Sequence, residues 1–405
     1  MEPKESQHFY FGAATAAHQV EGNNIHSDWW KFEQEVQVKK NFLSGKATNH
    51  YELFDHDFAL AEKLGHDAHR FSIEWAKIEP EEGKFQQDVL DHYREVFKSL
   101  KKHGLKPFTT LWHFSLPEWF AKKGGFEKRD NIFYYVRYCK KIAEVFKDEM
   151  EYIITLNEPM VYLYYAYLAG KWPPQKKSFV SFVKVLSNLM RAHREVYKNL
   201  KQVNPDFKIG VAKNNPAFSP DRRGNIFDWF LVHLLKYLWN HLFLDGISKC
   251  QDFIGLNYYF HRNMRFDIKM IDQFFIHPCN SCDVTDMGWE VYPRGVAGLL
   301  RDLWKRYHKP LIITENGVAD HKDRLRGDYI ESVLEHIFNV KKEGVDVFGY
   351  LHWSLTDNFE WADGYDPRFG LIEIHYGNFV RTVRPSAYKY EKLIKSYRKT
   401  LTDKS

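Results

Sequence analysis

The sequence predicts an α/β protein, a single (β/α)8 TIM barrel spanning residues 1–405. Three observations carry this prediction: eight short apolar runs, amphipathic stretches of helical spacing between them, and no Ser/Gly-rich linker dividing the chain. Strands that alternate with helices imply parallel strands joined by helical crossovers, and eight such units close a barrel. A doubly wound open sheet is the competing architecture. It should carry a Gly-rich phosphate loop after an early strand, and the sequence has no G-x-G-x-x-G motif.

Each expected strand is a short run rich in apolar and β-branched residues. In chain order the eight runs are FYFGAATA (9–16), DAHRFSI (67–73), KPFTTLWH (106–113), EYIITLN (151–157), FKIGVAK (207–213), DFIGLNY (252–258), KPLIITEN (309–316) and VFGYLHW (347–353). We expect longer insertions after the first, fourth and sixth strands.

The expected helices have apolar residues three and four positions apart, which gives each helix one face for the core. The best examples are residues 50–65, 89–104, 131–147 and 328–344. The first two of these end in glycine, a helix stop signal.

The bulk properties exclude several classes of function. A net charge of +5 is small for 405 residues, and the basic residues are scattered beside acidic ones, so we expect no nucleic-acid partner. The start of the chain lacks a secretory signal and no apolar stretch reaches 18 residues, so we expect a soluble, cytoplasmic protein without a membrane partner. Four cysteines do not make a disulfide scaffold.

Polar residues at the ends of the expected strands are the candidates for an active site, because barrel active sites lie at the C-terminal ends of the strands. Glu158 follows strand four in TLNEP and Glu315 ends strand seven in ITENG, so the two carboxylates should face each other across the barrel mouth. Other strand-end candidates are Gln19, Glu21, Arg70, Ser72, Glu74, Trp112, His113, Asn157, Asn257, Tyr259, Asn316, Trp353, Glu360, Trp361 and Phe369.

Two carboxylates flanked by amides, an arginine and tryptophans fit glycoside hydrolysis, which needs a carboxylate on each side of the scissile bond. The alternative is that both glutamates merely stabilise helix N-termini. A catalytic metal would require several strand-end histidines, and His113 is the clear one. Cys279 and Cys282 form one C-x-x-C near His277, which we interpret as free thiols rather than a metal or redox site.

At this point the sequence resembles the family 1 glycoside hydrolases, which are retaining β-glycosidases. The resemblance covers nearly the whole chain and rests on FYFGAATAAHQVEG, HRFSIEWAKIEP, TLWHFSLPEWF, TLNEP, DFIGLNYY, TDMGWEVYPRGV, ITENG and WSLTDNFEWADGYDPRFG. It implies an exo-acting β-glucosidase that releases a terminal β-D-glucosyl, or galactosyl or fucosyl, residue through a glycosyl-enzyme. Its expected substrates are β-glucosides and oligosaccharides, without an organic cofactor or metal.

The resemblance also implies a role for each site residue. Glu158 would be the acid/base and Glu315 the nucleophile, with Arg70 and Tyr259 holding the nucleophile ionised. Asn157 would bind the sugar 2-hydroxyl, near Asn257. The remaining positions match residues that surround the sugar or the leaving group: Gln19, His113, Glu360, Trp361, Trp353 as a stacking floor, Phe369, and Trp289 on the leaving-group side.

The resemblance leaves three alternatives open. The same site could pass the sugar to an acceptor other than water, and a barrel that has lost catalysis could bind sugar or a protein. Such inactive relatives lack one of the two glutamates, and both are present here. A 6-phosphorylated sugar is disfavoured, since the Glu360 carboxylate would repel the phosphate.

Overall fold

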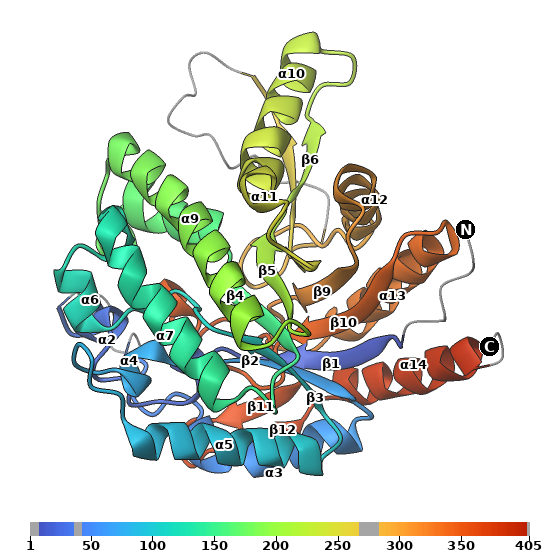
Figure 1. Cartoon of the computed structure of the whole chain (residues 1–405). Coiled ribbons are helices and arrows are strands. Elements are labelled where there is room, and N and C mark those ends of the chain that lie inside the picture. The colour runs from blue at the N-terminus through green and yellow to red at the C-terminus, as the bar shows by residue number, and fades with distance from the viewer. Residues whose placement is uncertain (1–7, 36–42, 267–282, 403–405) are drawn as a thin grey trace.

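The computed structural model describes residues 8–35, 43–266 and 283–402, and within them eight parallel strands close a barrel (Figure 1). Every expected run contains one strand, so the predicted (β/α)8 barrel is confirmed. Around the barrel the order is β1-β10-β9-β7-β5-β4-β3-β2. The bounds are β1 (Tyr10–Ala14), β2 (Ala68–Ser72), β3 (Lys106–Thr110), β4 (Tyr152–Asn157), β5 (Lys208–Asn214), β7 (Phe253–Tyr258), β9 (Leu311–Asn316) and β10 (Val347–Trp353).

The first strand closes the barrel by pairing with both β2 and the last strand, β10. Ala14 lies opposite Trp353 on one side and opposite Arg70 on the other. A Cβ on Gly12 would lie 1.9 Å from the carbonyl oxygen of Ala68, so this strand needs a glycine where the backbones approach each other.

Apolar side chains fill the barrel and also separate the strands from the helices. The interior cluster lies toward the N-terminal ends of the strands and consists of Ala68, Phe108, Tyr152, Ile154, Ala212, Phe253, Ile312, Phe348 and Leu351, with Tyr10 packed against it. A larger cluster lies between the strands and the helices. The apolar interior closes the N-terminal end of the barrel. The polar residues at the C-terminal ends of the strands therefore lie together at the opposite, open end.

Helices surround the strands, as Figure 1 shows. The four segments expected to be helical are confirmed within two residues at most boundaries, and Gly65, Gly104 and Gly344 follow three of them with positive φ. The helices on the outside of the barrel are α3 (His50–Lys63), α5 (Gln87–Lys102), α7 (Ile132–Val145), α9 (Phe179–Val203), α11 (Leu242–Ile247), α12 (Gly295–Tyr307), α13 (Arg326–Lys342) and α14 (Pro385–Thr402).

The three longest connections follow β1, β4 and β7, as expected for strands one, four and six. The connection after β5 also carries additional structure: β6 and α10 extend away from the barrel at the top of Figure 1. The smaller elements are α1 (Ala17–Val20), α2 (Asp28–Glu35), α4 (Trp75–Ile78), α6 (Glu118–Lys122), η1 (Gly125–Glu127), η2 (Arg129–Asn131), α8 (Pro159–Leu163), η3 (Tyr164–Leu168), β6 (Ala217–Pro220), α10 (Ile226–Leu235), η4 (Lys236–His241), β8 (His261–Met264), η6 (Trp361–Asp363), β11 (Ile372–His375) and β12 (Val380–Val383).

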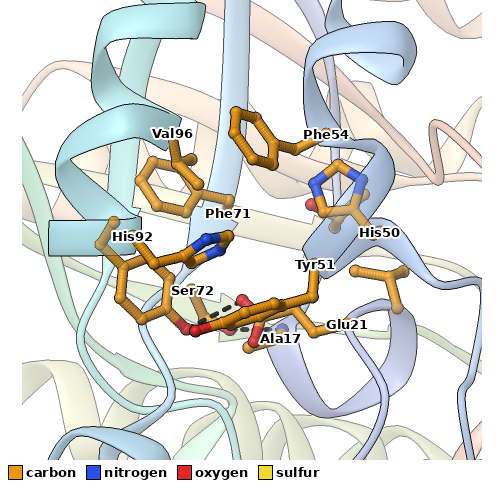
Figure 2. Close-up of a pocket in the computed structure, with 12 residues that line it drawn as sticks. Ala17, Glu21, His50, Tyr51, Phe54, Phe71, Ser72, His92 and Val96 are labelled. Atoms are coloured by element: carbon orange, nitrogen blue, oxygen red, sulfur yellow. Dashed lines mark hydrogen bonds between the residues drawn. The ribbon is translucent and has the colours of Figure 1, made fainter. Parts of the chain in front are cut away.

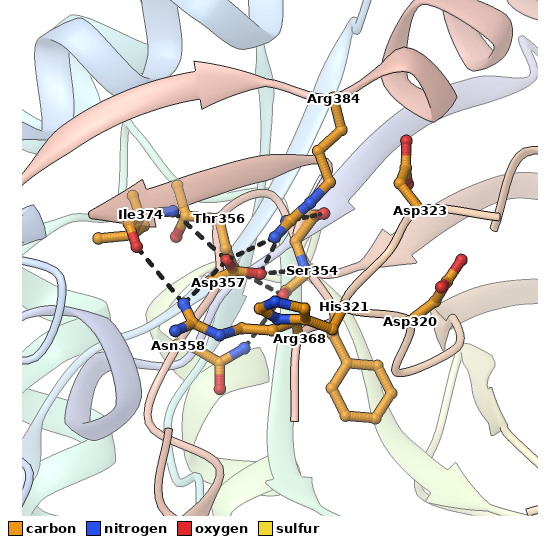
Figure 3. A network of polar contacts seen from close by, with 12 residues as sticks. Asp320, His321, Asp323, Ser354, Thr356, Asp357, Asn358, Arg368, Ile374 and Arg384 are labelled. Atoms are coloured by element: carbon orange, nitrogen blue, oxygen red, sulfur yellow. Dashed lines mark hydrogen bonds and ion pairs between the residues drawn. The ribbon is translucent and has the colours of Figure 1, made fainter. Parts of the chain in front are cut away.

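A buried carboxylate holds the segment that follows β10. Asp357 is fully buried and accepts hydrogen bonds at 2.8 and 2.9 Å from the guanidinium of Arg384, and one at 3.2 Å from Arg368 (Figure 3). The backbone N–H groups of Gly370 and Ile374 also donate to it. One side chain of the loop between β10 and β11 therefore ties it to β11 and to the segment that follows β12.

We predict that Asp357→Ala lowers the free energy of unfolding by about 3–5 kcal/mol, because the buried Arg384 and the partly buried Arg368 lose their counter-charge. Denaturant unfolding followed by circular dichroism measures the change. Glu343→Ala is the matched control. Glu343 forms a bidentate pair with Arg301, but the two side chains are 46% and 49% exposed, so we expect a loss below about 1 kcal/mol. Equal losses in the two variants would contradict the role of Asp357.

Candidate active site

The two predicted catalytic glutamates lie on the same rim of the barrel, with two strands between them. Glu158 directly follows β4, and Glu315 is the penultimate residue of β9. The strands between them, β5 and β7, place Asn214 opposite Asn257 and Asn257 opposite Glu315. The side chain of Asn257 therefore lies between the two carboxylates and hydrogen-bonds Glu158 at 2.8 Å.

Glu315 has a charged partner. The Arg70 guanidinium forms an ion pair with its Oε1, and the Tyr259 hydroxyl donates to its Oε2 at 2.6 Å. Glu315 is 3% exposed, and burial raises the pKa of its carboxyl, while Arg70 and Tyr259 oppose that rise. Both partners favour the ionised form, and Arg70 and Tyr259 contact this residue as expected from the sequence.

Glu158 has neutral partners instead. Its Oε1 accepts hydrogen bonds from Asn257 and, at 3.2 Å, from Asn214. Burial and the nearby charge of Glu315 raise the pKa of Glu158 to about 7, which the two amides oppose. Its backbone is in the left-handed region with φ 42°, and its N–H donates to the carbonyl of Ala212 at 2.8 Å. This sparsely populated conformation is held between the end of β4 and Pro159 at the start of α8.

Asn157 connects Arg70 to His113. Its Oδ1 accepts from the Arg70 guanidinium at 2.7 Å, which directs its amide nitrogen to Nε2 of His113 at 3.0 Å. Burial and the charge of Arg70 hold the pKa of His113 well below its usual range, so the ring is neutral. The buried Nδ1 of this ring has no hydrogen-bond partner within the described residues.

Aromatic rings form the next part of the site. The ring of His113 stacks at 6.0 Å from that of Trp353 and 6.1 Å from that of Trp361. Trp361 in turn packs against Trp172, which sequence reasoning did not single out. The π-faces at this end of the barrel thus belong to the last residue of β10 and to residues in the segments after β3, β4 and β10.

Gln19 and Glu360 meet next to Trp361. The Gln19 amide nitrogen donates to the carbonyl of Phe359 at 2.9 Å and to Glu360 at 3.3 Å. Burial and the neighbouring carboxylates Asp363 and Glu315 hold the pKa of Glu360 well above its usual range. Gln19 is fully buried, and its Oε1 lacks a hydrogen-bond partner among the described residues.

Trp289 lies on the other side of Tyr259. Its ring is 5.8 Å from Tyr259 and 6.2 Å from Phe369, and it is only partly buried. All thirteen predicted site residues therefore belong to one contiguous set of hydrogen bonds and ring contacts.

Several strand-end candidates lie elsewhere. Glu21 accepts from Tyr93 at 2.8 Å and pairs with Lys77 at 2.9 Å, beside a cavity of about 10 Å³ that has room for about one water (Figure 2). Ser72 accepts from the N–H of Ala17 near the same cavity. The functional interpretation of these two residues is not supported, because their side chains hold βα loops together.

Three further candidates are also structural. Glu74 accepts from Ser115 and from the first turn of α4, and Asn316 donates to the Tyr329 hydroxyl at 2.9 Å. Trp112 is buried in the core. Gly317, which follows Asn316, permits a close approach: a Cβ there would lie 2.0 Å from the carbonyl oxygen of Trp353.

Sequence reasoning missed the end of β5. Asn214 donates to Glu158, and the adjacent Lys213 is fully buried. The signal was available, since every other strand contributed polar residues at its C-terminal end and this strand ends in Lys-Asn-Asn.

Cys139 and Cys250 are free thiols. The C-x-x-C motif with His277 lies outside the described residues. Within the described part of the chain, there is no group of three or more His, Cys, Asp or Glu side chains that could hold a metal ion. Nor does any described helix have the length and apolarity to cross a membrane.

The comparisons with known proteins agree with the geometry. Residues 3–243 and 243–399 match the sequence pattern of glycosyl hydrolase family 1. Beta-glucosidase A of Thermotoga maritima is 32% identical, with 96% of this chain and 97% of that protein covered. The solved β-glycosidase of Pyrococcus horikoshii is 39% identical with a TM-score of 0.90, over 98% of this chain and 96% of that one. The T. maritima β-glucosidase in complex with glucoimidazole has a TM-score of 0.89 at 31% identity, over 96% of this chain and 98% of that one. The chain therefore belongs to glycosyl hydrolase family 1 and is a glycoside hydrolase.

Proposed function

We propose that the protein is a retaining, exo-acting β-glycosidase with β-D-glucosides as its preferred substrates, and that residues 1–405 form one catalytic domain. The observation that carries the assignment is the difference between the two glutamates. Glu315 has a guanidinium and a phenol as partners, whereas Glu158 has amides and a pKa of about 7. Carboxyls of opposite protonation state on either side of a bond are what retaining hydrolysis requires.

In the first step Glu315 attacks the anomeric carbon. The bond from that carbon to the leaving oxygen breaks, and Glu158 gives its proton to that oxygen, so a glycosyl-enzyme forms. The ester removes the charge of Glu315, which lowers the pKa of Glu158. In the second step a water oxygen attacks the same carbon and gives a proton to Glu158. The sugar leaves Glu315 with its β-configuration retained.

The sugar would lie between Gln19, His113 and the tryptophans. Gln19 Oε1 and His113 Nδ1 are buried polar atoms without protein partners among the described residues, which is the condition in which a sugar hydroxyl gains most by binding. Trp353 is the proposed stacking floor, Asn157 the 2-hydroxyl ligand, and Glu360 and Trp361 further ligands. The complexes of the relative with glucoimidazole and with galacto-hydroximolactam support glucose or galactose as the sugar.

The leaving group would lie toward Trp289 and Phe369. Trp289 is the more exposed of the two, as a residue at the open end of the site should be. We also propose a cytoplasmic location, which the free thiols of Cys139 and Cys250 support.

We predict that the wild type hydrolyses p-nitrophenyl β-D-glucoside. Its rates on the β-D-galactoside and the β-D-fucoside, compared with this rate, give its sugar preference. Glu315→Gln should lose activity on the order of 10⁴-fold or more, because no glycosyl-enzyme can form. Azide should restore turnover to Glu158→Ala and give the β-glycosyl azide, which NMR identifies. An α-configured azide would contradict the retaining assignment, and an inactive wild type would contradict the proposed activity.

We predict that kcat/KM of the wild type falls as the pH rises through about 7, because Glu158 must be protonated in the first step. Glu158→Gln should lose this alkaline limb in its residual activity on p-nitrophenyl β-D-glucoside, and 2,4-dinitrophenyl β-D-glucoside, whose leaving group needs no acid, should show little of the limb even with the wild type. A limb that survives in Glu158→Gln would assign the acid to another residue.

The same pKa predicts a stability effect. The pKa of Glu158 is raised in the folded state, so ionising it costs folding free energy as the pH rises from about 4.5 to about 7. Glu158→Gln should therefore be more stable than the wild type by about 1–3 kcal/mol at pH 8 and by much less at pH 4.5. Denaturant unfolding at both pH values measures this, and a gain independent of pH would contradict it.

We predict that the wild type discriminates strongly against p-nitrophenyl 6-phospho-β-D-glucoside, because the phosphate would meet Glu360 and the negative charges of Asp363 and Glu315, which add to the effect of burial in raising the pKa of Glu360. Glu360→Gln should lose about tenfold or more in kcat/KM for the glucoside while its relative rate on the 6-phosphate increases. Asp366→Asn, which removes an exposed carboxylate of the same loop, is the control for a general change of charge. An unchanged preference in Glu360→Gln would contradict the place given to Glu360.

A further inference from the structure

Lys213 is a fully buried lysine at the C-terminal end of β5, beside the candidate acid/base. The residue before it, Ala212, accepts the backbone hydrogen bond of Glu158 at 2.8 Å, and the residue after it, Asn214, donates its side-chain amide to Glu158 at 3.2 Å. Lys213 therefore belongs to the short piece of strand that holds Glu158 from the β5 side.

The ammonium of Lys213 has only neutral contacts within the described residues. It donates to the carbonyl of Asn214 and, at 3.1 Å, to Oδ1 of Asn215, and it lies 5.8 Å from the ring centre of Trp239. A buried ammonium without a carboxylate in contact is unfavourable, and an apolar residue of similar length would fill this position at lower cost. Its presence therefore calls for a reason beyond packing.

Glu158 supplies that reason, because the residues on both sides of Lys213 contact it and so place its carboxyl near this end of the strand. Burial lowers the pKa of Lys213 to about 7, and the charge that opposes this effect is that of Glu158. Conversely, Lys213 lowers the pKa of Glu158, against burial and the charge of Glu315. The other titratable groups whose pKa responds to the Glu158 charge are Tyr165, Tyr259 and Glu360.

We propose that Lys213 is a positioning residue for both proton transfers: its buried ammonium supplies the positive charge on the Glu158 side of the site, as Arg70 does on the Glu315 side. This inference rests on the proposed function, because it concerns the same acid/base residue. The positive charge makes Glu158 a stronger acid toward the leaving oxygen.

The charge matters most in the second step. Once Glu315 is esterified its charge is gone, but burial still favours the protonated form of Glu158, which cannot accept a proton from water. Within the described residues, the groups that favour its carboxylate are then Lys213 and the amides of Asn214 and Asn257. Lys213 thereby helps Glu158 to change from acid to base during one turnover.

The test is Lys213→Met, which removes the charge and keeps the length of the side chain. We expect the alkaline limb of kcat/KM for p-nitrophenyl β-D-glucoside to move up by about half a pH unit or more. With 2,4-dinitrophenyl β-D-glucoside, whose second step is slow, kcat and KM at pH 6 should fall together by about tenfold as the glycosyl-enzyme accumulates. Lys213→Arg, which keeps the charge, should return the alkaline limb toward its wild-type position.

The matched control is Lys341→Met. Lys341 is partly buried and, like Lys213, donates to a backbone carbonyl, but that carbonyl belongs to Val347 at the N-terminal end of β10, so neither readout should change. An unmoved limb in an active Lys213→Met enzyme would overturn the inference and leave the proposed function intact. If Lys213→Met does not fold, Lys213→Gln takes its place. Loss of the fold in both would make Lys213 a structural residue and overturn the inference as well. An inactive wild type would instead overturn the proposed function.

Discussion

The ion pair between Arg70 and Glu315 is the constraint on which the site depends. Both side chains are buried, and removing either would leave an uncompensated charge at the barrel mouth. The same guanidinium fixes the orientation of Asn157, and through it that of His113. One arginine on β2 therefore sets the ionisation of one carboxylate and orients side chains that follow from two other strands.

The barrel separates the two glutamates into different environments although each comes from the end of a buried strand. Glu315 lies within β9 and meets charge and a phenol, whereas Glu158 lies one residue beyond β4 in a left-handed conformation and meets amides. Asn257 hydrogen-bonds Glu158 and also lowers the pKa of Glu315, so its position links the two. Different partners at one rim are how a single scaffold can hold one carboxyl ionised and the other protonated.

The fold and most of the site could be predicted because each depends on local pattern. Apolar runs and helical spacing defined all eight strands, and the C-terminal ends of parallel strands must meet. Local pattern does not predict which of the polar side chains at these strand ends points into the site. Glu21 and Gln19 lie two residues apart, yet Glu21 pairs with Lys77 and Tyr93 away from the site. The polar end of β5 is visible in the sequence, but the contact of Asn214 with Glu158 depends on the long-range pairing of β5 with β4.

In the proposed mechanism, Glu315 forms the covalent bond to the sugar and Glu158 transfers protons. Treatment of the wild type with 2,4-dinitrophenyl 2-deoxy-2-fluoro-β-D-glucoside slows both steps and should trap the glycosyl-enzyme, because the fluorine destabilises the oxocarbenium-like transition state. Peptide mass spectrometry of the inactivated protein then locates the sugar. We expect one 2-deoxy-2-fluoroglucosyl group per chain, attached to Glu315. A group attached to Glu158 or to any other residue would contradict this mechanism.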